Sequence, residues 1–239
     1  MDTYINAVKN RTKLPSKAMV ITFDDGHIGN YELLPIIKKL NIPVTIFLCA
    51  SIIDTNRQFW FQYDELPMSA EKLKKKKNNE RLKILRKAGF DKNHEYDSAS
   101  ALQRKHIEEM RPYVNFQAHA MYHPIFPNCD DEEVRTEIFG TKEALENKFG
   151  LEINAIAYPN GDYCERTIRL SKEAGYQCGL TVEYGFNDLE SDLFILKRLG
   201  LDDSYDKNEL IAKVSGLWDF IKTRNGRKQT VGKTEKVVS

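Results

Sequence analysis

The stretch Ala18-Met-Val-Ile-Thr-Phe-Asp-Asp-Gly26 indicates the fold class, because a run of strand-forming residues ends there in a strong turn signal. Residues 30–40 then carry apolar side chains at helical spacing, and Val44-Thr-Ile-Phe-Leu-Cys49 predicts a fully buried strand. A strand, a helix and a second strand at this spacing are typical of the βαβ unit of a parallel sheet. This part of the chain therefore predicts an α/β fold.

The alternation of strands and helices continues along most of the chain. Further strands are predicted at residues 114–118, 153–157, 179–182 and 194–196, and helices at 131–149, 165–174 and 207–221. Residues 54–112 interrupt this order, with helices predicted at about 81–87 and 99–110 and a lysine run at 74–77. We interpret the segment as a helical insertion over one end of the sheet, and the lysine run as a solvated helix face.

The composition excludes some classes of protein. The chain of 239 residues carries 36 basic and 35 acidic side chains, and this near-neutral charge gives no reason to expect a nucleic-acid partner. Its 41% of hydrophobic residues suffice for a core, which excludes a wholly disordered chain. We expect one domain over residues 1–223 and a polar tail over 224–239. The sequence leaves the oligomeric state open.

Features that direct proteins to membranes or export are missing from the sequence. The N-terminal stretch has no apolar segment of the kind that a secretory signal requires, and no apolar run is long enough to span a bilayer. The four cysteines are scattered without a CxxC pair, and we interpret them as reduced. These features predict a cytoplasmic protein without an integral membrane segment.

Polar residues gather directly after the predicted strands. They are Asp24, Asp25 and His27 after the first strand, His119 and His123 after residue 118, Asn160 and Asp162 after residue 157, and Arg198 after the strand at 194–196. In a parallel α/β barrel all these positions lie on one rim, at the carboxyl ends of the strands, where active sites form. We therefore expect them to converge.

The adjacent carboxylates of Asp24 and Asp25 have two interpretations. Asp and Gly make good turns after strands, and a turn alone would account for them. However, two carboxylates at the end of a buried strand are costly unless something neutralises one of them. A divalent cation bound by one Asp would do so, and would leave the other as a general base.

Two further motifs follow the later strands. His119 and His123 are four residues apart and suit a divalent metal if Asp25 supplies the third ligand; otherwise they are ordinary surface or capping histidines. Ala157-Tyr-Pro-Asn-Gly161 is either a plain β-turn or a turn whose backbone N–H near Asn160 points at a developing oxyanion.

Together these motifs resemble those of the polysaccharide deacetylases, the carbohydrate esterase family 4 enzymes that share the NodB homology domain. Thr22-Phe-Asp-Asp-Gly26 matches the first signature of the family, and His119-Ala-Met-Tyr-His-Pro124 matches its H-x-x-x-H-P metal motif. Ala157-Tyr-Pro-Asn-Gly161 resembles the third signature in its Y-P-N-G form. The resemblance extends from about Ala18 to Arg198.

The resemblance implies a distorted (β/α) barrel with fewer than eight complete units. It also implies a divalent metal held by Asp25, His119 and His123, with Asp24 as the catalytic base. The implied reaction is hydrolysis of an N-acetyl group, less often an O-acetyl group, from a sugar or polysaccharide precursor, with a metal-bound water as the nucleophile. Zinc is the first choice of metal, while cobalt, nickel, iron and manganese stay open.

The sequence departs from the family pattern at two positions. The arginine that orients the base in the third motif is Ala157 here, and Arg198 is our candidate substitute, unless it is only a structural ion-pairing residue. The late histidine that serves as general acid is also missing, because no histidine follows His123. His27 is our candidate for that role, and a turn residue packing beside the site is the alternative.

The substrate contacts are the least specific part of the prediction. We expect Tyr122, Pro159 and Tyr163 to contact substrate. Trp60, Phe61 and Trp218 also offer faces on which a sugar can stack, although aromatic residues in such numbers are usually core. Two other functions stay open: a sugar-binding barrel with weakened catalysis, and a metal-dependent hydrolase of another amide or ester. The presence of both Asp24 and Asp25 favours an enzyme over a binding module.

Overall fold

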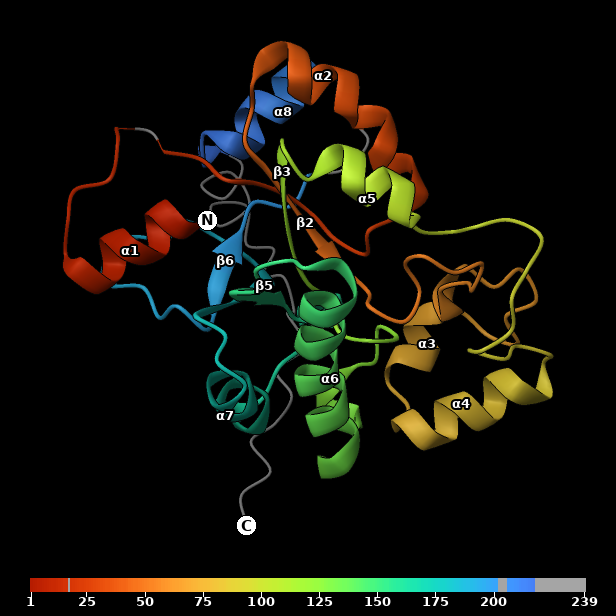
Figure 1. The fold of residues 1–239 in the computed structure, drawn as a ribbon. Helices are drawn as coiled ribbons and strands as arrows, with labels where there is room; N and C mark the ends of the chain where they lie inside the picture. The colour runs from red at the N-terminus through yellow and green to blue at the C-terminus, as the bar shows by residue number, and fades with distance from the viewer. Residues whose placement is uncertain (17, 202–205, 218–239) are drawn as a thin grey trace.

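One parallel sheet organises the computed structural model, which describes residues 1–16, 18–201 and 206–217 (Figure 1). Its strands, β1 to β6, run in chain order across the sheet. Their bounds are Ile21–Phe23, Val44–Leu48, Val114–Ala118, Ala155–Ala157, Cys178–Tyr184 and Leu196–Arg198. The sheet curls into a distorted (β/α) barrel with fewer than eight units, as predicted. All the strands are parallel, so their carboxyl ends share one rim.

Helices cover the outside of the curled sheet (Figure 1). The α-helices, α1 to α8, are Asp2–Asn10, Leu34–Leu40, Ala70–Lys74, Asn78–Lys87, Arg104–Met110, Asp131–Phe149, Glu165–Glu173 and Lys207–Val214. Short 3-10 helices lie at Ile28–Leu33, Trp60–Gln62, Phe126–Asn128 and Pro159–Gly161. In the described part of the chain, no helix has both the length and the apolar character needed to cross a membrane.

The central strands β2, β3 and β4 are buried on both faces, whereas β1 is half-buried and β5 and β6 have exposed residues. In β2, Ile46 and Leu48 pack in the cluster beneath the outer helices, whereas Phe47 packs in a second, smaller cluster formed by side chains of the strands. Ile5 of α1 joins that inner cluster and is 1% exposed. Helix α1, which contributes Ile5 to this inner cluster, was not predicted from the sequence.

The longest helix follows its sequence signals closely. Asp130 and Glu133 form a capping box at the start of α6, where each side chain accepts a hydrogen bond from the backbone of the other. Gly150 ends the helix in the left-handed conformation with φ of 60°. The prediction of a helix over 131–149 is confirmed.

Several predicted boundaries were wrong for local reasons. β1 begins at Ile21 instead of residue 18, and Met19 and Val20 stay exposed. β4 begins at Ala155 because the side-chain oxygen of Gln117 accepts the backbone N–H groups of residues 154 and 155. The strand expected at 194–196 lies at 196–198, so Arg198 is the last residue of β6.

Two predicted helices also begin or end elsewhere. The helix expected at 99–110 begins at Arg104, because Ser100 and Leu102 form backbone hydrogen bonds with the turn after β1. The segment expected as a helix over 30–40 is a 3-10 helix up to Leu33 and becomes α-helical only at Leu34. The last predicted helix is described as far as Val214, and residues 218–221 lie outside the described part.

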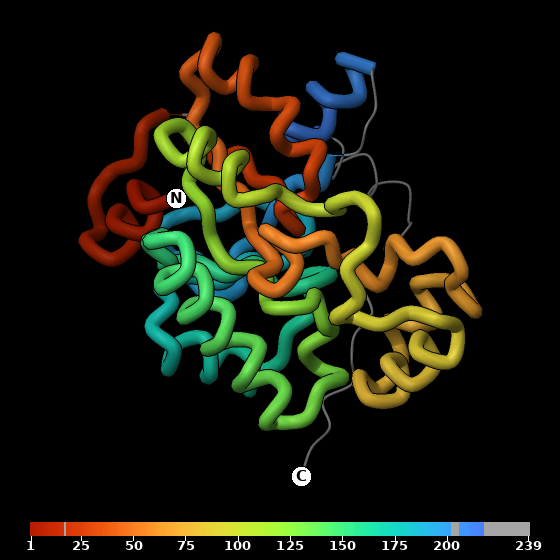
Figure 2. The backbone as a smooth tube through the Cα atoms, turned by 45° about the vertical axis from the view of Figure 1, so that its right-hand side comes forward, coloured from red at the N-terminus to blue at the C-terminus, as the bar shows by residue number. Residues whose placement is uncertain are grey.

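The segment between β2 and β3 carries α3, α4 and α5, and its α3 and α4 part packs beside the barrel (Figures 1 and 2). It has a small apolar cluster of its own, formed by Trp60, Leu73, Leu85 and Phe90. The prediction that the lysine run forms one solvated helix face is wrong. Lys74 ends α3 and α4 begins only at Asn78. The run is instead the connection between the two helices.

Candidate active site

Asp25, His119 and His123 meet at the carboxyl rim of the sheet. Each offers one ligand atom, and these atoms lie within 4.8 Å of one another. Asp25 Oδ1 is 3.3 Å from His119 Nε2 and 3.5 Å from His123 Nε2. Residues nearly a hundred positions apart in the chain are therefore brought together in the arrangement that a metal ion with two imidazoles and one carboxylate requires.

A backbone contact fixes the orientation of His119. Its Nδ1 lies 2.8 Å from the carbonyl oxygen of Ala157. A carbonyl only accepts hydrogen bonds, so Nδ1 carries a proton and Nε2 is the ring nitrogen that faces Asp25. Burial lowers the pKa of His119, but the carboxylates of Asp24 and Asp25 outweigh that effect and leave the pKa raised.

His123 is buried, which disfavours the charged form of its imidazole. Burial, followed by the positive charge of His119, lowers the pKa of His123 to about 3. Its Nδ1 and the Oδ1 of Asp25 are both buried, and neither has a hydrogen-bond partner among the described residues. The buried oxygen of Asp25 is costly unless a ligand meets it, and it faces the Nε2 atoms of both histidines, so two imidazoles and one carboxylate form a suitable donor set for a divalent cation. The residues present therefore fit a metal ion.

The backbone at these positions adopts a conformation that few side chains tolerate. Asp25, Ala120 and His123 have φ of 71°, 66° and 54°, in the left-handed region. Gly26 is left-handed as well, and a Cβ there would come within 2.6 Å of Leu48 Cδ2. The Asp-Asp-Gly turn needs its glycine for this reason.

Glu137 of α6 supports the loop between the two histidines. One of its carboxylate oxygens accepts the backbone N–H of Met121 at 2.7 Å and that of Tyr122 at 3.2 Å. Burial raises the pKa of Glu137 to about 7, although these two hydrogen bonds lower it. Glu137 was not predicted from the sequence; the available signal was its place beside Val134 and Ile138, which lie on the buried face of the helix.

Arg198 is paired with Asp24 across the opening between β6 and β1. Two nitrogens of the guanidinium donate to the two oxygens of the carboxylate, each at 2.7 Å, and Nε donates to the carbonyl of Thr181 at 2.7 Å. Burial raises the pKa of Asp24, but His119 and then Arg198 outweigh it, so the pKa lies below its usual range. Asp24 is therefore an ionised carboxylate beside Asp25, held in one orientation.

β4 contacts the site through the backbone carbonyl of its last residue, Ala157, and a tight turn follows it. Asn160 is left-handed with φ of 59°, and its side chain donates to Asp162 at 2.6 Å. Gly161 has φ of 74°, and a Cβ there would lie 2.6 Å from the backbone nitrogen of Val182. Ala157, which stands where the family has an arginine, supplies the carbonyl that orients His119.

His27 performs a local structural task in this structure. Its Nδ1 accepts the backbone N–H of Gly29 at 3.1 Å and caps the 3-10 helix that follows. Within the described residues, no hydrogen bond or ion pair links His27 to Asp24, Asp25, His119 or His123. Its role as the general acid stays a prediction.

The residues predicted to contact substrate lie in the loops that follow β3 and β4. Tyr122 lies between the two histidines, and its hydroxyl donates to Asn93 at 3.0 Å. Tyr163 stacks on Tyr158, and its hydroxyl donates to Glu183 at 3.1 Å. Pro159 is buried in the turn after β4. Their contact with substrate also stays a prediction.

Two of the other aromatic residues contact His123. Trp60 is 3% exposed, and its indole N–H donates to the carbonyl of His123 at 2.9 Å. The ring of Phe61 meets the imidazole edge-on, with centroids 4.8 Å apart. Trp218 lies outside the described residues.

The fold and these motifs define a class of protein, and a comparison with family models establishes it. The polysaccharide deacetylase model matches residues 11–179, which is more than half of the chain. The chain therefore belongs to the polysaccharide deacetylase family, as its motifs predicted.

Individual relatives are distant. The chain is 24% identical over 190 residues to YxkH of Bacillus subtilis, itself assigned to the polysaccharide deacetylases; the match covers 78% of this chain but only 53% of YxkH. The chain thus spans about half the length of that curated relative.

Solved structures share the fold. The deacetylase PplD of Streptococcus pyogenes, solved with acetate, has a TM-score of 0.65 at 22% identity, covering 89% of this chain and 77% of PplD. IcaB from Ammonifex degensii has a TM-score of 0.60 at 19% identity, covering 89% of this chain and 85% of IcaB.

Proposed function

We propose that the protein is a metal-dependent hydrolase that removes an acetyl group, most readily an N-acetyl group, from a sugar or glycan precursor. The observation that carries this proposal is the convergence of Asp25, His119 and His123 beside a second carboxylate that Arg198 holds in place. Membership of the polysaccharide deacetylase family supports the substrate class. A cytoplasmic location and an acetylated glycan partner belong to the same proposal.

Asp25, His119 and His123 would hold the metal, with zinc as the first choice. A divalent ion bound there supplies Lewis acidity, which polarises an acetyl carbonyl and lowers the pKa of a water molecule. The neutral imidazole of His123 and the Nε2 lone pair of His119 are the donors that such an ion prefers.

Asp24 acts as the general base in this proposal. Each carboxylate oxygen keeps a free lone pair while it accepts a hydrogen bond from Arg198, so Asp24 can still take a proton from the attacking water. Arg198 keeps the carboxylate ionised and fixes its orientation. This pairing supports the hypothesis that Arg198 replaces the arginine missing at Ala157.

The remaining steps fall to the turn after β4 and to a proton donor. The backbone N–H of Asn160 donates to the oxygen that becomes negative as water adds to the carbonyl carbon. The bond from that carbon to nitrogen then breaks, a proton is delivered to the nitrogen, and acetate and a free amine leave. His27 is the proposed proton donor, and comparison of the pH–rate profile of His27→Gln with that of the wild type tests it. An unchanged profile would remove His27 from the mechanism.

The test is acetate release from acetylated chito-oligosaccharides with zinc or cobalt added after chelation. We expect the metal to restore acetate release to the wild type. We expect Asp24→Asn, which keeps the shape of the base but not its charge, to release acetate about 100-fold more slowly or worse. Metal binding without acetate from any acetylated glycan would favour a sugar-binding barrel. Acetate from simple amides or esters but not from glycans would favour another hydrolase.

A further inference from the structure

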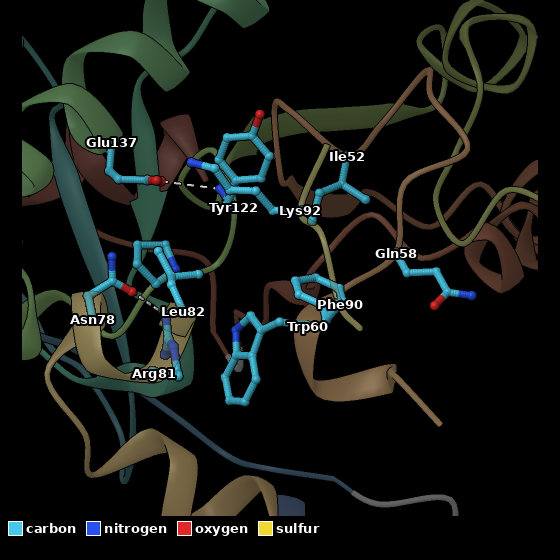
Figure 3. A pocket seen from close by; sticks show the side chains of 11 residues that line it. Ile52, Gln58, Trp60, Asn78, Arg81, Leu82, Phe90, Lys92, Tyr122 and Glu137 are labelled. Atoms are coloured by element: carbon cyan, nitrogen blue, oxygen red, sulfur yellow. Dashed lines mark hydrogen bonds between the residues drawn. The ribbon is translucent and has the colours of Figure 1, made fainter. Parts of the chain in front are cut away.

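A pocket lies between the insertion and the barrel, next to the loop that carries the two histidines. Its empty space amounts to about 380 Å³, a figure that includes space open to solvent. Its walls come from the start of the insertion, from α4, from the stretch at 90–92, from Tyr122 and Pro124, and from α6 (Figure 3). Because Tyr122 and Pro124 flank His123, this pocket adjoins the proposed metal centre.

The basic residue inside the pocket lacks partners for most of its donors. Arg81 is 2% exposed, and its Nη2 donates to Asn78 at 2.6 Å. Its Nε and Nη1 are buried and have no hydrogen-bond partner within the described ranges. The indole ring of Trp60 lies against one face of the guanidinium, 4.4 Å from its central carbon. The unused donors must therefore be met in the plane of the guanidinium.

No carboxylate neutralises Arg81 at ion-pair distance in the part of the chain that the structure describes. Burial lowers the pKa of Arg81 to about 10, although Cys129, Glu137 and Glu133 raise it, so the guanidinium stays charged at neutral pH. Glu133 is already bonded to the amide of Asn78, at 3.0 Å. A buried charge without a counter-ion is costly, and structures keep one where a ligand supplies the opposite charge.

The other charged residues of the pocket leave it positive. The ammonium of Lys92 lies 4.4 Å from the centre of the Tyr122 ring. Glu137 is the acidic group on the wall, and one of its oxygens is already occupied by the backbone N–H groups of the histidine loop. Figure 3 shows Glu137, Asn78 and Arg81 along one side of the pocket and Phe90 on the other.

We propose that this pocket binds an oxyanion, a carboxylate or a phosphate, carried by the glycan substrate next to the sugar that loses its acetyl group. Arg81 would meet the oxyanion with the Nε and Nη1 donors that the protein leaves unused, and Lys92 would add a second positive charge. This inference rests on the proposed function and narrows it to acidic glycans. Trp60 connects the two sites, since it covers Arg81 and also holds the carbonyl of His123.

Trp60 provides a direct assay, because its ring contacts Arg81. In a Trp218→Phe background, Trp60 is the remaining tryptophan of the chain, and its fluorescence can be titrated with D-glucuronate, D-glucose 6-phosphate and uncharged D-glucose. We expect a saturable change with one or both anions and none with glucose. A response to only one anion identifies the oxyanion as carboxylate or as phosphate. No saturable change with either anion would overturn the proposal.

Two variants and a chelation control locate the binding. Arg81→Lys keeps the charge but loses the planar pair of donors, and we expect it to weaken anion binding by about tenfold or more. Lys92→Gln should weaken binding several-fold, and it decides the question if Arg81→Lys does not fold. The proposal would be overturned if both variants bound the anion with the affinity of the wild type. So would loss of the signal on metal chelation, because the anion would then be bound at the metal.

Activity separates this inference from the proposed function. We compare acetate release from neutral acetylated oligosaccharides with release from acetylated oligosaccharides that contain uronic acid. A lower KM for the acidic substrate, raised by Arg81→Lys while the KM for the neutral one is unchanged, supports the inference. Equal KM values would contradict it while leaving the deacetylase function intact. No acetate from either substrate would contradict the proposed function, and the fluorescence titration would still decide whether the pocket binds an oxyanion.

Discussion

The ion pair between Arg198 and Asp24 joins the two edge strands of the curled sheet, and its removal has a predictable cost. The guanidinium contributes two short hydrogen bonds to the carboxylate, and the side chains of Arg198 and Asp24 are only 16% and 27% exposed. Breaking a fully buried pair costs about 3–5 kcal/mol, and partial exposure here reduces the expected coupling to about 2 kcal/mol. For a chain of this length that corresponds to a fall in melting temperature of about 4–8 °C.

The assay is a double-mutant cycle in urea on the metal-free protein. Its corners are the wild type, Arg198→Ala, Asp24→Asn and the double variant, so the coupling energy is isolated from the effect of each substitution alone. Arg198→Lys is the matched control, since it keeps the charge but not the pair of parallel hydrogen bonds, and we expect an intermediate stability. We also expect Arg198→Ala to reduce kcat by about 100-fold, because Asp24 loses its orientation. A coupling energy below about 0.5 kcal/mol would refute the pairing as a structural link between the edges.

Three further predictions follow from the geometry. Asp24→Asn should abolish most acetate release while retaining metal, since Asp24 is placed beside the ligands and is not one of them; loss of metal from Asp24→Asn would contradict that assignment. Relative to Glu137→Gln, the wild-type metal-free protein should lose at most about 3 kcal/mol of stability as the pH rises from about 4.5 to about 7, because the raised pKa of Glu137 makes the folded state keep a proton that the unfolded state has lost. The lowered pKa of His123 makes stability rise with pH in both proteins, so it cancels in this comparison. A difference between the two proteins that does not change with pH in urea titrations would contradict the assignment to Glu137. Gly161→Ala should lower the free energy of unfolding by about 3 kcal/mol, because an added Cβ would lie 2.6 Å from the backbone of Val182. Gly175→Ala is the control and should lower it by only about 1 kcal/mol, because a Cβ there would meet nothing within 4 Å. Equal losses of stability in the two variants would refute the close approach at Gly161.

The sequence predicted the parts of the fold that local chemistry determines. The buried runs of β2 and β3 and the capped helix α6 were predicted because apolar spacing and end signals lie within each element. α1 was missed because it buries only Ile5 and Ala7, which is too few residues to show a periodic apolar face. The lysine run was misread because residues of high helix propensity also occur in the turn between two short helices.

The residues of the site were likewise predictable only where a local sequence signal marks them. Asp25, His119 and His123 were predictable because each follows a strand, and parallel strands end at one rim. Glu137 and Arg81 were missed because a charged residue on an amphipathic helix is expected to face solvent, whereas tertiary packing buries Arg81 and half-buries Glu137. The carbonyl of Ala157 that orients His119 carries no signal in the sequence, since every residue has a backbone carbonyl.

The central claim is that Asp25, His119 and His123 hold a divalent metal ion, and metal content measures it most directly. The full chain is loaded with zinc, dialysed and analysed by mass spectrometry, beside Asp25→Ala, His119→Ala and His123→Ala and the control Asp24→Asn. We predict one zinc ion per chain in the wild type and in Asp24→Asn, and little in the three ligand variants. Zinc retained equally by all five proteins, or by none of them, would contradict the claim.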